Sequence, residues 1–303
     1  MIQYFKFQSP WLQFLIILSI ILIVFYFSKK KQFNEGFEQS LPFVLKQENE
    51  IYDDFYCEIY DYLQKSSSRI EFETIQIIEM TQPSKNNSVL LDIGCGTGHL
   101  VNSLNELGYK TFGIDQSSAM IEYSKQKFPK HQHRFSINNA MDTMIYERNV
   151  FTHILCMNFT IYHFQDKSAF FKHCYFWLIP NGYLVIHLVN RNTYNPIVPS
   201  GMPSSRLLEN PQQYSKSRIT DTEIDFQDFQ YKHTCNFDKE NQVIIHEKFT
   251  DSATKHIRQN ELTLYMEKTD DILKIARECN FLPISQIQMK DDKHQSIYIL
   301  EKV

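Results

Sequence analysis

A glycine-rich turn at residues 89–100 has the residue types and the spacing to bind a ligand. The run VLLDIGCGTGHL begins as an apolar strand that ends in Asp92, and Gly94, Gly96 and Gly98 then lead into a helix. Glycines permit positive φ angles and let the backbone approach a ligand closely, because no Cβ stands in the way. The N–H groups at the start of the helix can bind a polar group. The turn therefore predicts a binding site for a polar ligand.

A second acidic residue stands at a spacing typical of nucleoside binding. Asp115 ends the next apolar run and lies 21 positions after Gly94 (115 − 94). This spacing places its carboxylate over the same crevice, where it can accept hydrogen bonds from both hydroxyls of a ribose. The dinucleotide fingerprint G-x-G-x-x-G would need a glycine at 99, where this sequence has His99. The sequence therefore has the acidic residue that could bind a ribose, but it lacks the third glycine of the dinucleotide fingerprint.

Alternating strand and helix patterns must position these residues. Strands that alternate with helices predict a parallel sheet covered on both faces. Helical patterns cover 50–63, 99–107, 117–127 and 166–177, and the first of them places Tyr52, Tyr56 and Tyr60 on one face. Apolar strand patterns cover 89–93, 109–114, 135–137, 151–157 and 183–189.

The pattern changes after about residue 190. Four prolines between 196 and 211 mark an irregular crossing, and strand-like runs follow at 224–234, 243–249 and 255–266. A helix at 270–279 and two strands, at 284–289 and 296–300, complete the chain. We expect residues 190–266 to form an inserted, β-rich cap on a domain that spans 49–303.

The N-terminal part of the chain predicts a membrane anchor. Residues 11–27, WLQFLIILSIILIVFYF, carry no charge and reach the lower limit of the ~17–25 residues that cross a bilayer. Three lysines follow at 29–31, which favours a single-pass protein whose catalytic domain lies on the cytoplasmic side. We expect a tail at 1–10, the lipid-embedded anchor at 11–27 and a juxtamembrane tether at 28–48. A cleaved signal peptide and a buried core helix are the alternatives.

Composition excludes several classes of protein. The 303 residues carry a formal net charge of -4, which argues against wrapping of duplex nucleic acid, since that needs an excess of Lys and Arg. The six cysteines form no C-x-x-C pair and do not cluster with histidines at zinc-finger spacing. We therefore expect reduced thiols, no structural metal and no nucleic-acid partner.

The motifs resemble those of the class I S-adenosylmethionine-dependent methyltransferases. The run DIGCGTG at 92–98 matches the first motif of that family, and GIDQSSAMI at 113–121 matches the second. The resemblance implies a Rossmann-like, mostly parallel seven-stranded sheet in the order 3-2-1-4-5-7-6, with helices on both faces and the last strand antiparallel. It also implies S-adenosyl-L-methionine as the cofactor. By this resemblance the cofactor-binding residues are Tyr60, Asp92, Gly94, Cys95, Gly96, Thr97, Gly98, Asp115, Gln116, Asn139, Ala140, Met141 and Asn158.

The implied roles of these residues differ. The backbone from Gly94 to Gly98 and Asp92 would seat the methionine part of the cofactor, Asp115 would hold the ribose, and Tyr60 would cover the ligand. Asn139 stands where the family often has an acid, and it could contact adenine N6 only through its carbonyl oxygen. Thr152 and His153 replace the acid common at the start of the fourth strand.

Methyl transfer from a sulfonium depends mainly on placement, so a base is needed only when the acceptor carries a proton at pH 7. Tyr162 and His163, after the fourth strand, and His187, near the end of the fifth, are the candidates. For His187 the alternative is a hydrogen-bonded core histidine, and for His163 it is a loop residue with no role. Arg258 could clamp an acidic acceptor, or it could be solvated or ion-paired.

Three functions are compatible with the sequence. A methyltransferase acting on a small-molecule or lipid-derived acceptor fits best, because an inserted cap would enclose the acceptor. A protein or nucleic-acid methyltransferase is the second, although residues 158–161, NFTI, lack the N-P-P-Y tetrad of enzymes that methylate nucleic-acid amino groups. A membrane-tethered module that binds the cofactor without turnover is the third.

Overall fold

The computed structural model describes residue 11 and residues 14–20, 40–64, 66–199, 211–290 and 292–303. The chain divides into two compact units, residues 1–38 and residues 39–303. In the first unit, residues 14–20 are helical. None of the helices in the described part of the chain is both long and apolar enough to span a bilayer. The rest of the anchor expected at 11–27, the tail expected at 1–10 and residues 28–39 of the expected tether lie outside the described residues.

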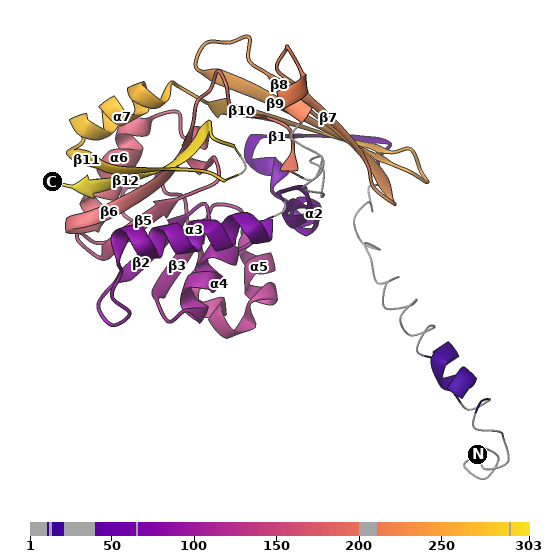
Figure 1. The fold of residues 1–303 in the computed structure, drawn as a ribbon, viewed down its shortest axis with the longest axis horizontal. Coiled ribbons are helices and arrows are strands. Elements are labelled where there is room, and N and C mark those ends of the chain that lie inside the picture. Colours follow the sequence, from indigo (N-terminus) through magenta and orange to yellow (C-terminus); the bar gives the residue numbers. More distant parts are fainter. Residues whose placement is uncertain (1–10, 12–13, 21–39, 65, 200–210, 291) are drawn as a thin grey trace. The chain divides into compact units, whose positions relative to one another are not determined.

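A seven-stranded sheet forms the base of the second unit (Figure 1). Its order is β4-β3-β2-β5-β6-β12-β11, which is 3-2-1-4-5-7-6 when these strands are numbered along the chain. The order is the expected one, and β12 is antiparallel to both of its neighbours, as expected. The strands are β2 (Val89–Ile93), β3 (Lys110–Asp115), β4 (Phe135–Ile137), β5 (Phe151–Cys156), β6 (Leu178–Val189), β11 (Phe281–Gln288) and β12 (Gln295–Lys302).

Helices cover both faces of this sheet, so its central strands are buried on both sides (Figure 1). On one face, Phe170, Phe171 and Trp177 of α6 are fully buried in the main core cluster. On the other face, Ile77 of α3 packs with Leu104 of α4. The helices are α2 (Asp54–Gln64), α3 (Ser66–Thr81), α4 (His99–Glu106), α5 (Ser118–Lys127), α6 (Lys167–Trp177) and α7 (Thr269–Glu278).

Local capping explains where two of these helices begin. The Ser117 side chain accepts a hydrogen bond from the N–H of Met120 at 3.1 Å and starts α5 directly after β3. Asp166 caps α6 in the same way, through the N–H of Ala169. Both helices therefore start close to where the sequence predicts them.

A second sheet has five strands in the order β1-β10-β9-β8-β7, of which β7 to β10 follow β6 in the chain. We call this five-stranded sheet the cap. It differs from the prediction in two ways. The run expected at 224–234 is a hairpin, because the chain turns between β7 (Asp221–Asp225) and β8 (Phe229–Asn236). The remaining long strands are β9 (Gln242–Asp251) and β10 (Ile257–Tyr265).

The fifth cap strand comes from the other end of the domain. Strand β1 (Phe43–Gln47) pairs in parallel with β10, so the expected tether at 28–48 ends in a folded strand. A short helical turn, η2 (Glu48–Ile51), joins β1 to α2. The inserted strands therefore need a partner from outside 190–266 to complete their sheet.

Candidate active site

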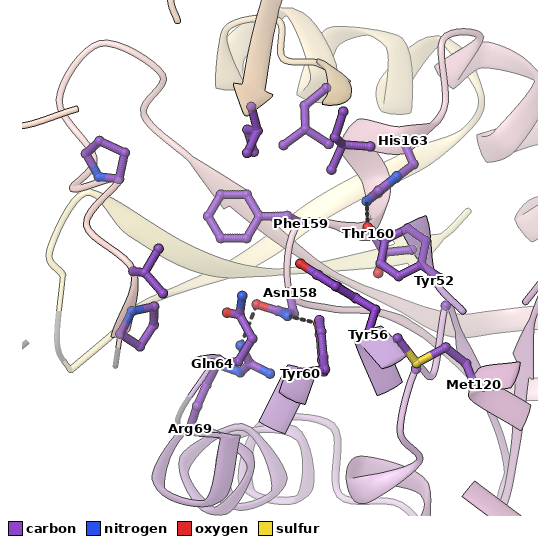
Figure 2. Close-up of a pocket in the computed structure, with 18 of the residues that line it drawn as sticks. Tyr52, Tyr56, Tyr60, Gln64, Arg69, Met120, Asn158, Phe159, Thr160 and His163 are labelled. Atoms are coloured by element: carbon purple, nitrogen blue, oxygen red, sulfur yellow. Dashed lines mark hydrogen bonds between the residues drawn. The ribbon is translucent and has the colours of Figure 1, made fainter. Parts of the chain in front are cut away.

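A large cavity lies between the carboxyl ends of the parallel strands and the cap (Figure 2). Its volume is about 680 Å³, which falls within the ~300–1,000 Å³ typical of small-molecule sites. One wall carries the glycine turn, Asp115 and the loop after β5. The opposite wall carries cap side chains, among them Ile245, Glu247 and Leu262. The ligand end predicted by the glycines is thus continuous with the space under the cap.

The three glycines of the turn have different structural tasks, although all have positive φ angles. A Cβ on Gly94 would lie 2.5 Å from the Thr160 side chain, and one on Gly98 would lie 2.8 Å from the Phe135 ring. Gly96 has a φ of +52°, and a Cβ there would meet only Cε1 of Tyr60, at 4.0 Å. Gly94 and Gly98 therefore permit close packing within the protein, whereas Gly96 opens toward the cavity.

Asp115 lies at the end of β3 with its carboxylate held by backbone donors. Oδ2 accepts from the N–H of Gly96 at 3.0 Å, and Oδ1 accepts from the N–H of Ser117 at 2.9 Å. Burial raises the pKa of Asp115, and these N–H donors oppose that effect. The N–H of Gln116 also donates to this carboxylate, so three of its about four acceptor sites are used and at least one remains for a ribose hydroxyl.

Helix α2 brings Tyr56 and Tyr60 to the cavity (Figure 2). Tyr52 also lines the cavity, but it precedes α2 and follows η2, so the helical face expected for all three tyrosines includes only two of them. Asp61, next to Tyr60, accepts hydrogen bonds from the Thr97 hydroxyl at 2.7 Å and from Nε2 of His99 at 2.9 Å. These contacts fasten α2 to the glycine turn, and they lower the pKa of Asp61 against the opposing effect of burial. Thr97 itself therefore serves this attachment and does not line the large cavity.

Arg69 is a site residue that sequence reasoning missed. Its guanidinium donates to Oδ1 of Asn158, and Nδ2 of Asn158 donates to the Tyr60 hydroxyl at 2.7 Å (Figure 2). Nε of Arg69 also lies 3.4 Å from the carboxylate of Glu73, which is buried beside Asp92 in a small hollow next to the cavity. In the sequence, the i, i+4 spacing of Arg69 and Glu73 on α3 was the signal that could have indicated this pair.

The other predicted cofactor residues divide by position. Gln116, Asn139 and Ala140 line the large cavity, and Cys95 lines the small hollow. The Asn139 carbonyl oxygen already accepts the N–H of Met141 at 3.0 Å. Met141 packs against the main core cluster and lines neither space.

Two of the three candidate bases do not line the cavity. The Tyr162 hydroxyl is fully buried and accepts the N–H of Val189 at 2.8 Å, which satisfies the backbone at the end of β6. His187 is also buried; its Nδ1 lies 3.4 Å from the N–H of Phe159, and burial lowers its pKa to about 3. The structure therefore contradicts the placement of Tyr162 and His187 at the reacting groups, and the core-histidine alternative holds for His187.

His163 does line the cavity, where Nε2 lies 3.4 Å from the Tyr52 hydroxyl (Figure 2). Burial lowers the pKa of His163 to about 4, so the imidazole is neutral at pH 7. Arg258 forms an ion pair with Asp53, with Nη1 2.8 Å from Oδ2. The ion-paired alternative for Arg258 is thus the correct one.

Three polar side chains of the cap were also missed. His233, Glu247 and Asn260 are directly opposite one another across β8, β9 and β10, and all three are buried. Because side chains directly opposite in a sheet share one face, these three form a polar row on the inner face of the cap, between apolar residues such as Ile245 and Leu262. A glutamate in register with Val243, Ile245 and Phe249 was the signal in the sequence.

Comparison with known proteins agrees with this architecture. A family model described as a methyltransferase domain matches residues 91–186, from β2 through most of β6. The ubiquinone biosynthesis O-methyltransferase of Rhodopseudomonas palustris (strain TIE-1) is 35% identical over 103 residues, which are 34% of this chain and 40% of that protein. The chain thus matches about two fifths of the length of this curated relative.

Solved structures resemble a larger part of the chain. An S-adenosylmethionine-dependent methyltransferase from Clostridium acetobutylicum has a TM-score of 0.60 at 19% identity, over 81% of this chain and 97% of that one. The CcbJ methyltransferase from Streptomyces caelestis has a TM-score of 0.63 at 12% identity, over 84% and 99%. The chain has the fold of these S-adenosylmethionine-dependent methyltransferases, and residues 91–186 match the methyltransferase domain model.

Proposed function

We propose that this protein is an S-adenosylmethionine-dependent methyltransferase that acts on a small-molecule or lipid-derived acceptor. The observation that carries the proposal is the continuity of the cavity, which runs from Gly96 and Asp115 to the inner face of the cap. One end is built for a nucleoside and the other for a separate, mostly apolar molecule. A group transfer between two ligands needs such an arrangement.

The residues at the first end suit the cofactor. Gly96 leaves the space that a Cβ would fill, and the Asp115 carboxylate is positioned to accept a ribose hydroxyl. Asn139 and Ala140 would line the adenine position, and Gln116 would flank it. Arg69, oriented by Asn158, supplies a cation for the methionine carboxylate, while Tyr60 would cover the ligand next to Gly96.

S-adenosylmethionine supplies a methyl group already activated by its sulfonium, so the protein mainly aligns the acceptor and excludes water. Tyr52 and Tyr56 line the cavity, and the Tyr56 hydroxyl donates to Glu247 of the cap wall at 3.0 Å. Of the three candidate bases only His163 faces the cavity, and it is a weak base, because burial lowers its pKa to about 4. Tyr162 and His187 have no role in this proposal.

Titration calorimetry of the full-length protein with S-adenosylhomocysteine tests the cofactor assignment. Methyl-labelled S-adenosylmethionine, incubated with the protein and a small-molecule extract, then tests turnover. Binding and a labelled product of low molecular mass are the expected results. Absence of binding would refute the proposal, and binding without any labelled product would favour the non-catalytic module.

A protein or nucleic-acid acceptor is the second candidate. The cap disfavours it, because the reacting end of the cavity lies beneath a sheet whose inner face is largely buried. Label recovered in protein or nucleic acid, in place of small molecules, would support this candidate.

We also propose that residues 11–27 anchor the protein in a membrane with the methyltransferase domain on the cytoplasmic side. The support is the uncharged run in the sequence and the lysines at 29–31. Carbonate extraction and protease protection of the full-length chain test this. Release by carbonate would refute the anchor, and protection of the domain in vesicles with the cytoplasmic side outward would refute the orientation.

A further inference from the structure

Glu247 is a buried carboxylate on the cap wall of the cavity. Among the described residues of β7 to β10 that line the cavity, it is the only acid, and its neighbours there include Ile245, Leu262 and Leu264. It lies at the centre of the polar row, between His233 on β8 and Asn260 on β10. A charge at this position requires compensation, because the surrounding wall is apolar.

The protein satisfies Glu247 with neutral donors. Oε1 accepts from the hydroxyls of Tyr231 at 2.7 Å and Tyr56 at 3.0 Å, and Oε2 accepts from Nδ2 of Asn260 at 2.9 Å. A carboxylate has about four acceptor sites, so these three donors leave one. The arrangement holds the carboxylate in place and keeps it able to bind one further donor.

No cation of the described chain compensates this charge at close range. The structure gives no ion pair within 4.0 Å for Glu247 in the ranges that it describes. Arg258 is linked to the row, because its Nε donates to Oδ1 of Asn260 at 3.0 Å. However, its guanidinium is paired with Asp53 through two hydrogen bonds, so its charge is already matched.

His233 does not replace that cation. Its Nδ1 has no hydrogen-bond partner in the described structure, and burial lowers its pKa, although the neighbouring Glu247 charge opposes this. The wall therefore presents a net negative charge to the cavity, flanked by the tyrosines that donate to it. Aromatic rings and a carboxylate together are suited to an ammonium group.

We propose that the acceptor is an amine with an apolar body, and that Glu247 binds its ammonium group. The inference rests on the proposed methyltransferase function and names the acceptor class for it. Glu247 is also close to the cofactor end, since Tyr56, which donates to it, lies next to Tyr60, with ring centroids 6.0 Å apart. Tyr60 in turn is the side chain that faces Gly96.

The transfer itself balances without a further reactant. The ammonium first releases a proton to solvent, because His163, whose pKa burial lowers to about 4, is too weak a base to take it. The free nitrogen lone pair then forms the N–CH₃ bond as the S–CH₃ bond breaks, and the bonding pair stays on sulfur. The products are the N-methylated ammonium and S-adenosylhomocysteine.

Matched probes separate an amine acceptor from a hydroxyl acceptor. The panel pairs each amine with the alcohol of the same carbon skeleton: 2-phenylethylamine with 2-phenylethanol, tyramine with tyrosol, and octylamine with octanol. Binding to the full-length protein is measured by calorimetry with saturating S-adenosylhomocysteine present, and N-methyl product is measured with the labelled cofactor. We expect at least one amine to bind about tenfold to a hundredfold more tightly than its alcohol and to be methylated.

Two variants locate the preference. In Glu247→Gln the advantage of the amine should fall to within about threefold of its alcohol, since the charge-assisted bond is lost. In Glu223→Gln, which removes an exposed charge from β7 of the same cap, the advantage should persist. Unchanged affinity for S-adenosylhomocysteine in both variants shows that they are folded.

Three results would overturn the inference. They are a panel in which no amine exceeds its alcohol, an amine preference that survives Glu247→Gln, and a Glu247→Gln variant that loses affinity for S-adenosylmethionine but not for S-adenosylhomocysteine. The last result would make Glu247 the partner of the sulfonium. If the wild-type protein binds no S-adenosylhomocysteine, the proposed function itself fails.

Discussion

The Tyr60 hydroxyl accepts a hydrogen bond from the Asn158 side chain at 2.7 Å, which joins α2 to the loop after β5. The other end of the same amide accepts from Arg69. A helix from the start of the domain, a loop from its centre and a cation from α3 thus meet at one side chain. This junction places Arg69 beside the glycine turn and leads to the first prediction.

Arg69→Gln should weaken S-adenosylhomocysteine binding by about 1.5–3 kcal/mol, because a hydrogen-bonded cation is lost from the methionine end. Calorimetry measures this loss. The affinity for 5′-methylthioadenosine, which lacks the amino-acid group, should change little. Equal losses for both ligands would show that Arg69 acts on the pocket as a whole and not on the carboxylate.

Asp115→Ala should weaken the binding of S-adenosylhomocysteine and of 5′-methylthioadenosine by roughly 1.5–3 kcal/mol each, because both ligands contain the ribose. The matched control is Asp225→Ala, which removes an exposed carboxylate from β7 of the cap and should leave both affinities unchanged. Titration calorimetry of the two variants makes the comparison. Normal affinity in Asp115→Ala would mean that this crevice does not hold the nucleoside.

Gly96→Val should abolish cofactor binding while the domain stays folded, because the new side chain enters the cavity and not the protein interior. The backbone strain at a positive φ costs about 1–2 kcal/mol of folding stability. Gly108→Val has the same kind of strain at a φ of +91°, where a Cβ contacts only Lys85. Thermal unfolding should therefore show similar losses for both variants, and only Gly96→Val should lose binding.

Acid should destabilise the protein through its buried histidines. Burial lowers the pKa of His187 to about 3 in the folded protein, whereas an unfolded histidine titrates near 6.5. Folding favours the neutral form of His187. The contribution of His187 to the free energy of unfolding is therefore fully present above about pH 6.5 and is lost as the pH falls from that value toward 3. At pH 4.5 the loss from this one residue is roughly 2–3 kcal/mol.

Denaturant unfolding between pH 7 and pH 4.5 measures the effect. The decline should be shallower in His187→Asn than in the wild type, and unchanged in His133→Asn, which alters an exposed histidine. The slope with pH is the relevant quantity, because either substitution can also change stability at pH 7. Equal slopes in all three proteins would show that His187 is not held neutral by the fold.

The main sheet and the glycine turn could be predicted because their signals are local. The residues from Asp92 to Gly98 encode the strand end, the turn and the helix start in one short run, and Ser117 caps the next helix. The side chains of Tyr162 and His187 could not be placed in this way. Their loops and strands were correctly predicted, but backbone N–H groups at Val189 and Phe159 determine where the two polar side chains lie.

The acceptor end depended on contacts between distant residues. The Glu247 carboxylate is held by hydrogen bonds from Tyr56, 191 positions away, and from Asn260 on the next strand. A glutamate in an otherwise apolar register can be found in the sequence, but its donors cannot. The same holds for β1, whose residue Phe43 pairs with Ile257.

The position of β1 has a practical consequence for anyone who truncates this protein. A fragment that begins at residue 49, where the sequence places the domain boundary, would leave the hydrogen-bonding edge of β10 bare from Ile257 to Glu261. A fragment that begins at 46 would retain only two residues of β1. Bare strand edges pair with other chains, so such fragments should aggregate during purification. Recombinant versions should keep the chain from residue 39 onward, where the compact unit begins.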